Sequence, residues 1–206
     1  MSAGAPLVFA ITGASGAPYA VRLLEQLVRA KRDVWLIVSS HGQRLLATEC
    51  GIPDLDALRA RTGGAAGWKQ SITVFDDGDR GARPASGSAK SAGMVICPCS
   101  MGTLAAIAAG TSRSLVERAA DVALKERRRL VLMVRETPLH LGHLRAMVQA
   151  TEAGAIVMPP VPALYTKPAS IDEMVEHSVG RALDLFGLDS GRMRRWGEDT
   201  TPPAEE

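Results

Sequence analysis

The chain has 206 residues, of which 46% are hydrophobic and 22% are charged, and its formal net charge is +2. This length suits one domain with a substantial core, and the composition is that of an ordinary globular protein. The small net charge excludes a nucleic-acid or membrane binder that acts through its overall charge, so any cationic function is expected to be local.

Strands and helices are predicted to alternate along the chain. Continuous apolar runs are typical of strands that are buried on both faces, and they predict strands at 6–12, 33–40, 92–100, 129–136 and 155–161. Apolar residues at helical spacing predict helices at 19–32, 42–50, 103–110, 115–127, 140–154 and 170–187. Such alternation favours a single-domain α/β fold, Rossmann-like or flavodoxin-like, with a parallel sheet and helices on both faces.

Three segments stand outside this alternation. Residues 51–75 form a looser region without a predicted element, and residues 76–91 lack periodicity and are expected to form a mobile surface loop. The α/β domain is therefore expected to span 1–189. Residues 190–206 are expected to form a C-terminal tail whose end is disordered.

Small, hydroxyl-bearing or charged residues follow every predicted strand. They are "TGASGA", "SS", "PCSMGT", "RET" and "PPVPALY". In an open α/β sheet, ligands bind at the carboxyl ends of the strands. Five segments that converge on one edge predict a ligand site there more specifically than any one of them.

Two of these segments are candidate anion sites. "GASGAP" lacks the third glycine of the dinucleotide fingerprint and the Lys-Ser/Thr of a Walker loop, but its turn leads into a helix whose first N–H groups suit a phosphate. "CSMGT" places Ser100 and Thr103 at another helix start. A bare strand-to-helix turn and a simple helix cap explain the two segments equally well when each is taken alone.

The stretch "RAADVALKERRRLVLMVRE" at 118–136 is rich in cations. Arg118 and Lys125 are seven residues apart, so they lie on one line at the margin of the buried stripe of the predicted helix. The arginines at 127–129 complement the helix dipole, and most of that run is expected to be solvated. Arg135 and Glu136 end an inner strand at the ligand edge, where an arginine can hold a phosphate in a fork.

Cysteine and histidine residues do not form a recognisable metal motif. Cys97 and Cys99 lack further ligands at metal spacing and are expected to be small core residues. His140 and His143 are expected to be capping or surface residues. Three cysteines without a disulfide framework, no basic segment before the N-terminal apolar stretch and no apolar run of membrane-spanning length together favour a cytoplasmic protein.

Six stretches resemble one known family. They are "ITGASGAPYA", "PASGS", "VICPCSMGTLAAIAAG", "LVERAADVALKERRRLVLMVRETPLHLGHLRAM", "GAIVMPPVPALY" and "RWGE". Together they resemble the flavin prenyltransferases of the UbiX/Pad type, within the homo-oligomeric flavin-containing proteins. The resemblance implies a transferase that joins a dimethylallyl group from dimethylallyl monophosphate to reduced FMN, at N5 and then at C6. It also implies a homo-dodecamer with shared active sites, and a UbiD-type decarboxylase that receives the prenylated FMN.

The same resemblance assigns roles to individual residues. It implies that FMN is bound by Gly13, Ala14, Ser15, Ser39, Ser100, Met101, Gly102, Thr103 and Arg135. It implies that the prenyl phosphate is bound by Arg118, Lys125, Arg135, Tyr165 and Arg181. Catalytic roles fall to Ser15, Glu49, Lys125, Glu136 and Trp196, of which Ser15, Glu49 and Glu136 handle protons and Trp196 closes the site.

The chemistry explains these residue types. Ionisation of an allylic phosphate leaves negative charge on the departing oxygen, which Arg and Lys stabilise in a dry site. It also leaves a delocalised carbocation, which the faces of Tyr165 and Trp196 can stabilise. A carboxylate or the phosphate itself must accept the proton that N5 loses. Because the sequence shows no carboxylate cluster that would hold a metal, we predict a metal-independent enzyme.

Two other functions remain open. One is a flavin-dependent decarboxylase of a cysteine-type substrate, for which His41 is the candidate base. The other is a non-catalytic FMN carrier subunit. An RNA-binding function suggested by "KERRR" has neither stacking aromatic residues nor a recognisable module in its support.

Overall fold

The computed structural model describes residues 4–191 and 193. One six-stranded sheet forms its centre, in the order β3-β2-β1-β4-β5-β6, and all neighbouring strands are parallel. The strands are β1 (Leu7–Ile11), β2 (Val34–Val38), β3 (Ile72–Phe75), β4 (Met94–Cys99), β5 (Leu130–Val134) and β6 (Ile156–Val157). The order reverses direction between β1 and β4, which makes their carboxyl ends the topological switch point of the fold. The predicted fold class is confirmed.

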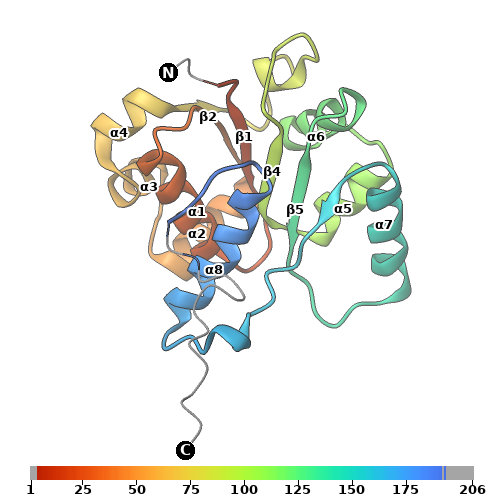
Figure 1. Ribbon diagram of the computed structural model, residues 1–206. Helices are drawn as coiled ribbons and strands as arrows, with labels where there is room; N and C mark the ends of the chain where they lie inside the picture. Colours follow the sequence, from red (N-terminus) through yellow and green to blue (C-terminus); the bar gives the residue numbers. More distant parts are fainter. Residues whose placement is uncertain (1–3, 192, 194–206) are drawn as a thin grey trace, which may run out of the picture.

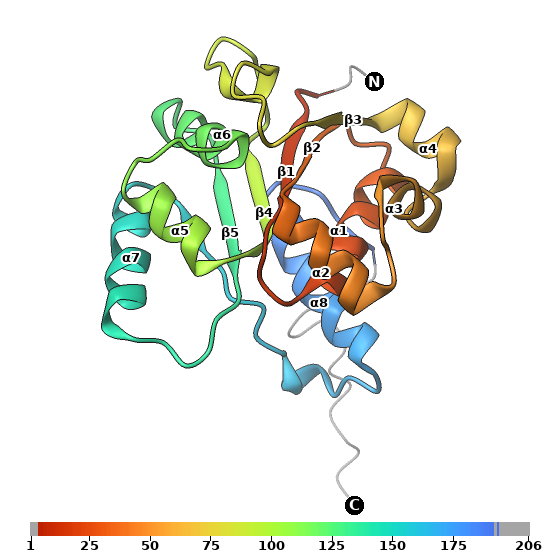
Figure 2. The same ribbon diagram turned by 180° about the vertical axis from the view of Figure 1, so that it is seen from behind.

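Helices cover both faces of the sheet (Figures 1 and 2). One face carries α1 (Ala17–Arg29), α2 (Ser40–Cys50), α3 (Leu55–Arg61), α4 (Gly64–Ser71) and α8 (Ile171–Asp184). The other carries α5 (Met101–Ala108), α6 (Leu115–Lys125) and α7 (Leu141–Glu152). Two short 3₁₀ helices, η1 (Arg83–Ala85) and η2 (Leu164–Thr166), lie in the connections. Within the described part of the chain, no helix has the length and apolar character that crossing a bilayer requires.

Two hydrophobic cores lie on opposite sides of the sheet. In β1, Phe9 and Ile11 pack toward α1 and α8, whereas Val8 and Ala10 pack toward α5 and α6. Successive side chains of a strand point to opposite faces, and here both faces are buried. This is why the strands have continuous apolar runs instead of an alternating pattern.

The looser region at 51–75 contains three elements that the sequence pattern did not predict. These are α3, α4 and the edge strand β3. The two middle residues of β3 are exposed, so the strand lacks a continuous apolar run. The helices have about two turns each and bury few side chains, chiefly Leu58 and Trp68. Their patterns are too short for a periodicity to be recognised.

The expectation of a mobile loop is wrong for residues 83–91. η1 buries Pro84 and Ala85, and the segment packs against α6. Arg128 donates from Nη2 to the Gly87 carbonyl at 2.7 Å and from Nη1 to the Ala89 carbonyl at 2.8 Å. Arg128 is therefore half-buried and structural, in contrast to the exposed arginines on either side of it.

Candidate active site

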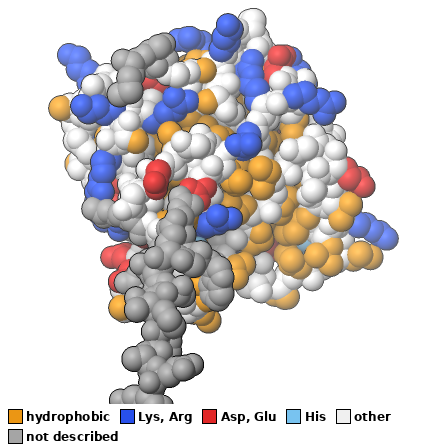
Figure 3. All heavy atoms as spheres, in the orientation of Figure 1, with side chains coloured by type: hydrophobic (Ala, Val, Ile, Leu, Met, Phe, Trp, Pro, Cys, Tyr) orange, Lys and Arg blue, Asp and Glu red, His pale blue; other side chains and the backbone are white. Residues whose placement is uncertain are grey.

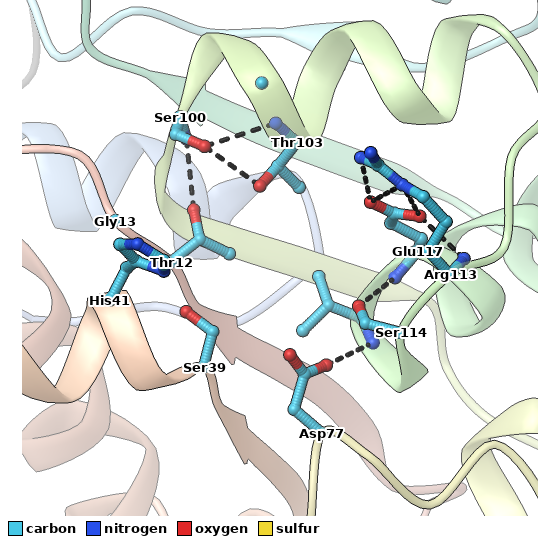
Figure 4. A pocket seen from close by; sticks show the side chains of 12 residues that line it. Thr12, Gly13, Ser39, His41, Asp77, Ser100, Thr103, Arg113, Ser114 and Glu117 are labelled. Atoms are coloured by element: carbon cyan, nitrogen blue, oxygen red, sulfur yellow. Dashed lines mark hydrogen bonds and ion pairs between the residues drawn. The ribbon is translucent and has the colours of Figure 1, made fainter.

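A cavity of about 390 Å³ opens at the switch point, where β1 and β4 end (Figure 4). Its volume is within the range of small-molecule sites. Five residues predicted to bind FMN line it, from three different turns: Gly13, Ser39, Ser100, Gly102 and Thr103. The other lining residues are Thr12, His41, Asp77, Arg113, Ser114, Val116 and Glu117. The structure thus brings together residues that lie up to about a hundred positions apart in the sequence.

Serine caps begin two of the helices around this cavity. Ser100 Oγ accepts from the Thr103 N–H at 3.2 Å and lies 2.9 Å from the Thr103 hydroxyl, at the start of α5. Ser39 Oγ accepts from the Gly42 N–H at 3.1 Å, at the start of α2. Both serines cap a helix and line the cavity. A helix cap and a ligand-binding role are therefore compatible for Ser100 and Thr103.

Gly13 allows a close approach between the β1–α1 turn and α2. A Cβ on Gly13 would lie 2.5 Å from His41 Cβ, which is closer than two carbon atoms can pack. The next predicted residue, Ala14, has a buried side chain, and its N–H donates to the Thr12 carbonyl at 3.0 Å. Met101 is also buried, in the core beneath α5. Ala14 and Met101 can therefore offer a ligand mainly their backbone.

The start of α1 is not the phosphate site that the sequence suggested. The N–H groups of Gly16 and Ala17 both donate to Glu49 Oε2, at 2.8 Å each. The carboxylate of α2 thus occupies the positive end of α1, where an external anion was expected. The expectation of free N–H groups at this turn is wrong, because a residue more than thirty positions away satisfies them.

Glu49, Ser15 and Arg135 form one cluster at this helix start. Partial desolvation raises the pKa of the Glu49 carboxyl, but hydrogen bonds from the Gly16 N–H and the Ser15 hydroxyl, together with the Arg135 charge, outweigh it and hold the pKa below its ordinary value. Arg135 Nε donates to the Ser15 carbonyl at 3.3 Å. Glu49 is consequently a carboxylate at neutral pH, oriented by fixed donors.

Glu136 follows Arg135 but points to different partners. Its Oε1 accepts from the Thr137 N–H at 3.1 Å, and the ion pairs of the described residues do not include one between Arg135 and Glu136. An ion pair with Arg135 would give Glu136 a purely structural role, and none is observed among the described residues.

The far wall of the cavity contains charged residues that the sequence analysis missed (Figure 4). Glu117 pairs with Arg113 Nη2 at 2.8 Å and accepts from the Arg113 N–H at 2.7 Å. Asp77 Oδ1 accepts from the Val116 N–H at 2.9 Å, which ties the end of β3 to the start of α6. The S-x-x-E spacing of Ser114 and Glu117 is a capping signal that could have located this helix start.

Arg118 and Lys125 both lie on α6, but Arg118 directly follows the cavity-lining Glu117, and only Lys125 lies at the other end of the sheet. Arg118 Nε donates to the Ala85 carbonyl at 3.2 Å and its Nη1 pairs with Asp121 at 2.6 Å, while Lys125 pairs with Glu126. Lys125 ends α6 just before β5 begins, and Arg135 follows β5 directly. Five residues of strand separate the two ends by about 16 Å. Within one chain, the structure does not bring Lys125 to Arg135.

Tyr165 and Arg181 are linked through His177. The Tyr165 hydroxyl lies 3.3 Å from His177 Nε2, and the two rings meet edge-on with centroids 5.9 Å apart. Arg181 lies one turn after His177 on α8 and pairs with Asp184 at 3.5 Å. Burial, followed by the charge of Arg181, holds the pKa of His177 below its ordinary value. Tyr165 and Arg181, two of the residues expected to bind the prenyl phosphate, therefore lie near each other.

The remaining predicted residues are placed as follows. Trp196 lies outside the described residues. Cys97 and Cys99 are free and buried in the core, as expected. His140 is the N-cap of α7, as expected, and His143 stacks on it with ring centroids 3.6 Å apart. Across residues 4–191 and 193, no group of three or more His, Cys, Asp or Glu side chains is arranged to hold a metal ion.

Known proteins share this architecture and much of this sequence. The Flavoprotein family matches residues 1–182. The flavin prenyltransferase UbiX of Thauera aromatica is 47% identical over 192 residues, which cover 92% of this chain and 93% of that protein. The crystal structure of AnUbiX in complex with FMN and dimethylallyl pyrophosphate matches with a TM-score of 0.83 at 43% identity, over 93% of this chain and 97% of that one.

A second crystal structure, of a dodecameric FMN-dependent UbiX-like decarboxylase from Escherichia coli O157:H7, has a TM-score of 0.82 at 38% identity. The match covers 93% of this chain and 98% of the chain in that structure. Both the family match and this level of identity extend over nearly the whole chain, including the turns around the cavity. The chain therefore belongs to the Flavoprotein family and, within it, to the UbiX-type flavin prenyltransferases.

Proposed function

We propose that this protein is a flavin prenyltransferase that transfers the dimethylallyl group of dimethylallyl monophosphate to N5 and then to C6 of reduced FMN. The observation that carries this proposal is the cavity at the switch point, because five of the residues expected to bind FMN meet there. The 47% identity to a flavin prenyltransferase supports the same reaction.

The residues around the cavity fit FMN. The hydroxyls of Ser39, Ser100 and Thr103 and the first N–H groups of α5 are donors for the phosphate and the ring carbonyls. Gly102 leaves room for a close approach of the ligand to the backbone, because a Cβ there would meet only Ser100 Oγ, at 3.9 Å. Reduced FMN, when bound, supplies the nucleophilic N5 and C6 atoms.

The Ser15–Glu49–Arg135 cluster would orient groups near the reacting edge of the flavin. Glu49 is held as a carboxylate by two N–H donors, so it serves best as a fixed hydrogen-bond acceptor that orients the Ser15 hydroxyl. Glu136 is exposed next to Arg135 and is the group we assign as acceptor of the N5 proton. Arg135, one of the proposed phosphate ligands, would stabilise the departing phosphate.

The other cations of the donor site would come from more than one chain. Tyr165 and Arg181 lie near each other on either side of His177, whereas Lys125 lies beyond the opposite end of β5 from Arg135. Arg118, in the first turn of α6, is paired with Asp121 of its own helix. We propose that a second copy supplies Arg118 and Lys125, with Trp196 closing the site. A water-excluding interface between copies would also strengthen the attraction between these cations and the phosphate.

The surface of α7 supports assembly into a homo-dodecamer. Leu141, Leu144 and Val148 lie on one side of this helix and are 60%, 46% and 56% exposed. Figure 3 shows hydrophobic side chains gathered on this side of the molecule. Exposed apolar patches of this kind mark interaction surfaces. A structure of a UbiX-like relative is dodecameric, and we propose the same assembly here.

The test is the mass of the flavin after the reaction. Purified protein is incubated without oxygen with FMN, a reductant and either dimethylallyl monophosphate or dimethylallyl diphosphate. We expect a flavin that is heavier by one prenyl unit, formed faster from the monophosphate. The product should activate a UbiD-type apo-decarboxylase. An unchanged flavin mass with both donors would overturn the proposal.

A cysteine-type decarboxylase is the second candidate, because His41 lines the same cavity. Release of carbon dioxide from a peptidyl or pantothenoyl cysteine would support it. A non-catalytic FMN carrier would keep its activation of the decarboxylase after Lys125→Ala, whereas the prenyltransferase would lose it.

We propose that the enzyme acts in the cytoplasm, where its three free cysteines remain reduced.

A further inference from the structure

Thr12 connects the two strands that meet at the switch point. The ladder between β1 and β4 ends at Ala10 and Ile96, and the pairing of β4 with β5 is irregular between Ile96 and Cys99. Beyond that point the regular ladder no longer joins the two central strands, and they are linked by other hydrogen bonds. Thr12, which is only 3% exposed, provides them.

The Thr12 hydroxyl both donates and accepts a hydrogen bond. Its Oγ1 donates to the Pro98 carbonyl at 2.9 Å and accepts from the Ser100 N–H at 3.0 Å. The Thr12 N–H also donates to the Pro98 carbonyl, at 3.2 Å. Removal of the hydroxyl would therefore leave Pro98 one of its two donors but would leave the Ser100 N–H without its acceptor.

Ser100 is the residue through which this connection reaches the site. It caps α5, holds the Thr103 hydroxyl and lines the cavity (Figure 4). Thr12 and its neighbour Gly13 both line the same cavity, from the β1–α1 turn. One buried hydroxyl thus links the β1–α1 turn to the β4–α5 turn.

We propose that Thr12 is a positioning residue that holds Ser100 and the start of α5 at the distance from the β1–α1 turn that FMN requires. This inference rests on the proposed function in so far as the ligand is FMN. A ligand site depends on the rotamers and turns that support it, because small displacements misalign several donors at once.

The chain offers a matched control in Thr62. This residue is 1% exposed, and its hydroxyl donates to the Leu58 carbonyl at 2.7 Å and accepts from Trp68 Nε1 at 2.9 Å. The geometry is that of Thr12, but Thr62 follows α3, outside the lining of the cavity. Thr62→Val therefore reports what the loss of a satisfied buried hydroxyl does without a positioning role.

The experiment compares Thr12→Val, Thr12→Ser and Thr62→Val in the full-length protein. FMN affinity is measured by quenching of flavin fluorescence, and stability by thermal unfolding. We expect both valine variants to unfold at a lower temperature. FMN binding should weaken about tenfold in Thr12→Val alone, because only this variant orphans a donor beside the ligand. Thr12→Ser should remain within about twofold of wild type because it keeps the hydroxyl.

A second readout needs no ligand. Hydrogen exchange of the Ser100 amide should become faster in Thr12→Val and remain unchanged in Thr62→Val. Equal FMN affinity of Thr12→Val and wild type, or an equal loss in Thr62→Val, would overturn the positioning role. If wild type binds no FMN, the proposed function fails, and the amide exchange of Ser100 still decides whether Thr12 positions α5.

Discussion

The two helix starts at the switch point both follow turns with small and hydroxyl-bearing residues, but they have different partners. α1 follows a glycine-rich turn, and its first N–H groups donate to the carboxylate of Glu49. α5 follows the turn after β4, is capped by its own Ser100, and faces the cavity. Both helices have a positive N-terminus, but the protein's own anion already occupies that of α1. A helix start is therefore a ligand site only if the tertiary structure leaves it open.

The largest expected effect concerns the start of α1, which Glu49 occupies. Glu49→Ala should lower kcat for prenyl transfer by about 100-fold to 1000-fold, because Ser15 loses the acceptor that orients it. FMN affinity should change by less than about threefold, since the cavity residues remain in place. Steady-state kinetics and flavin fluorescence measure the two quantities.

Two further variants test the role of Glu49 more closely. Glu49→Gln keeps the shape of the side chain and should retain more activity than Glu49→Ala. Glu152→Ala removes an exposed carboxylate at the end of α7 and should behave like wild type. Inorganic phosphate should stabilise Glu49→Ala more than wild type, because the start of α1 is then open to an anion. Full activity in Glu49→Ala would contradict the assigned role.

A smaller effect is expected at the start of α5, which faces the cavity and is capped by Ser100. Ser100→Ala removes the cap of α5 and a hydroxyl that lines the cavity, so FMN should bind about tenfold more weakly. Ser170→Ala is the control, because Ser170 Oγ caps α8 by accepting from the Glu173 N–H at 3.2 Å. Both variants should lose similar stability in thermal unfolding. Equal FMN affinity in both would show that Ser100 is only a cap.

A change of a few degrees in unfolding temperature is expected from the titration of Glu49. Its pKa in the folded protein lies below the ordinary value of 4.5, so its contribution to stability is complete above that pH. The contribution is lost as the pH falls through the lowered pKa, where the folded state must take up a proton. Thermal unfolding between pH 7 and pH 3 should therefore show a steeper loss in wild type than in Glu49→Gln. Parallel curves would contradict this linkage.

The smallest effect is expected from removal of metal ions. The donors at both helix starts are N–H groups and hydroxyls, and the charges proposed to hold the phosphate are arginine and lysine side chains. EDTA should thus change the rate of prenyl transfer by less than about twofold. Loss of activity in EDTA, restored by Mg²⁺, would require a metal ion at the donor site.

Part of the site could be read from the sequence because its signals are local. Gly13, Ser39 and Ser100 each follow directly after an apolar strand, and parallel strands bring such positions to one edge. Asp77 was missed because it follows β3, an edge strand whose exposed residues hide its periodicity. Arg113 and Glu117 were missed because their ion pair depends on the turn before α6.

The α/β class and the ligand site at the carboxyl edge of the sheet were predictable from the chain alone, because they follow from the length of its apolar runs and from the residues that end them. The flavin and the prenyl phosphate followed instead from the resemblance to a known family. Three features could be seen only in the folded chain: Glu49 occupies the start of α1, Thr12 joins the two central turns, and Lys125 lies away from Arg135. Contacts between residues far apart in the chain depend on how the strands pair and how helices pack on them, and periodicity within one segment carries no information about either.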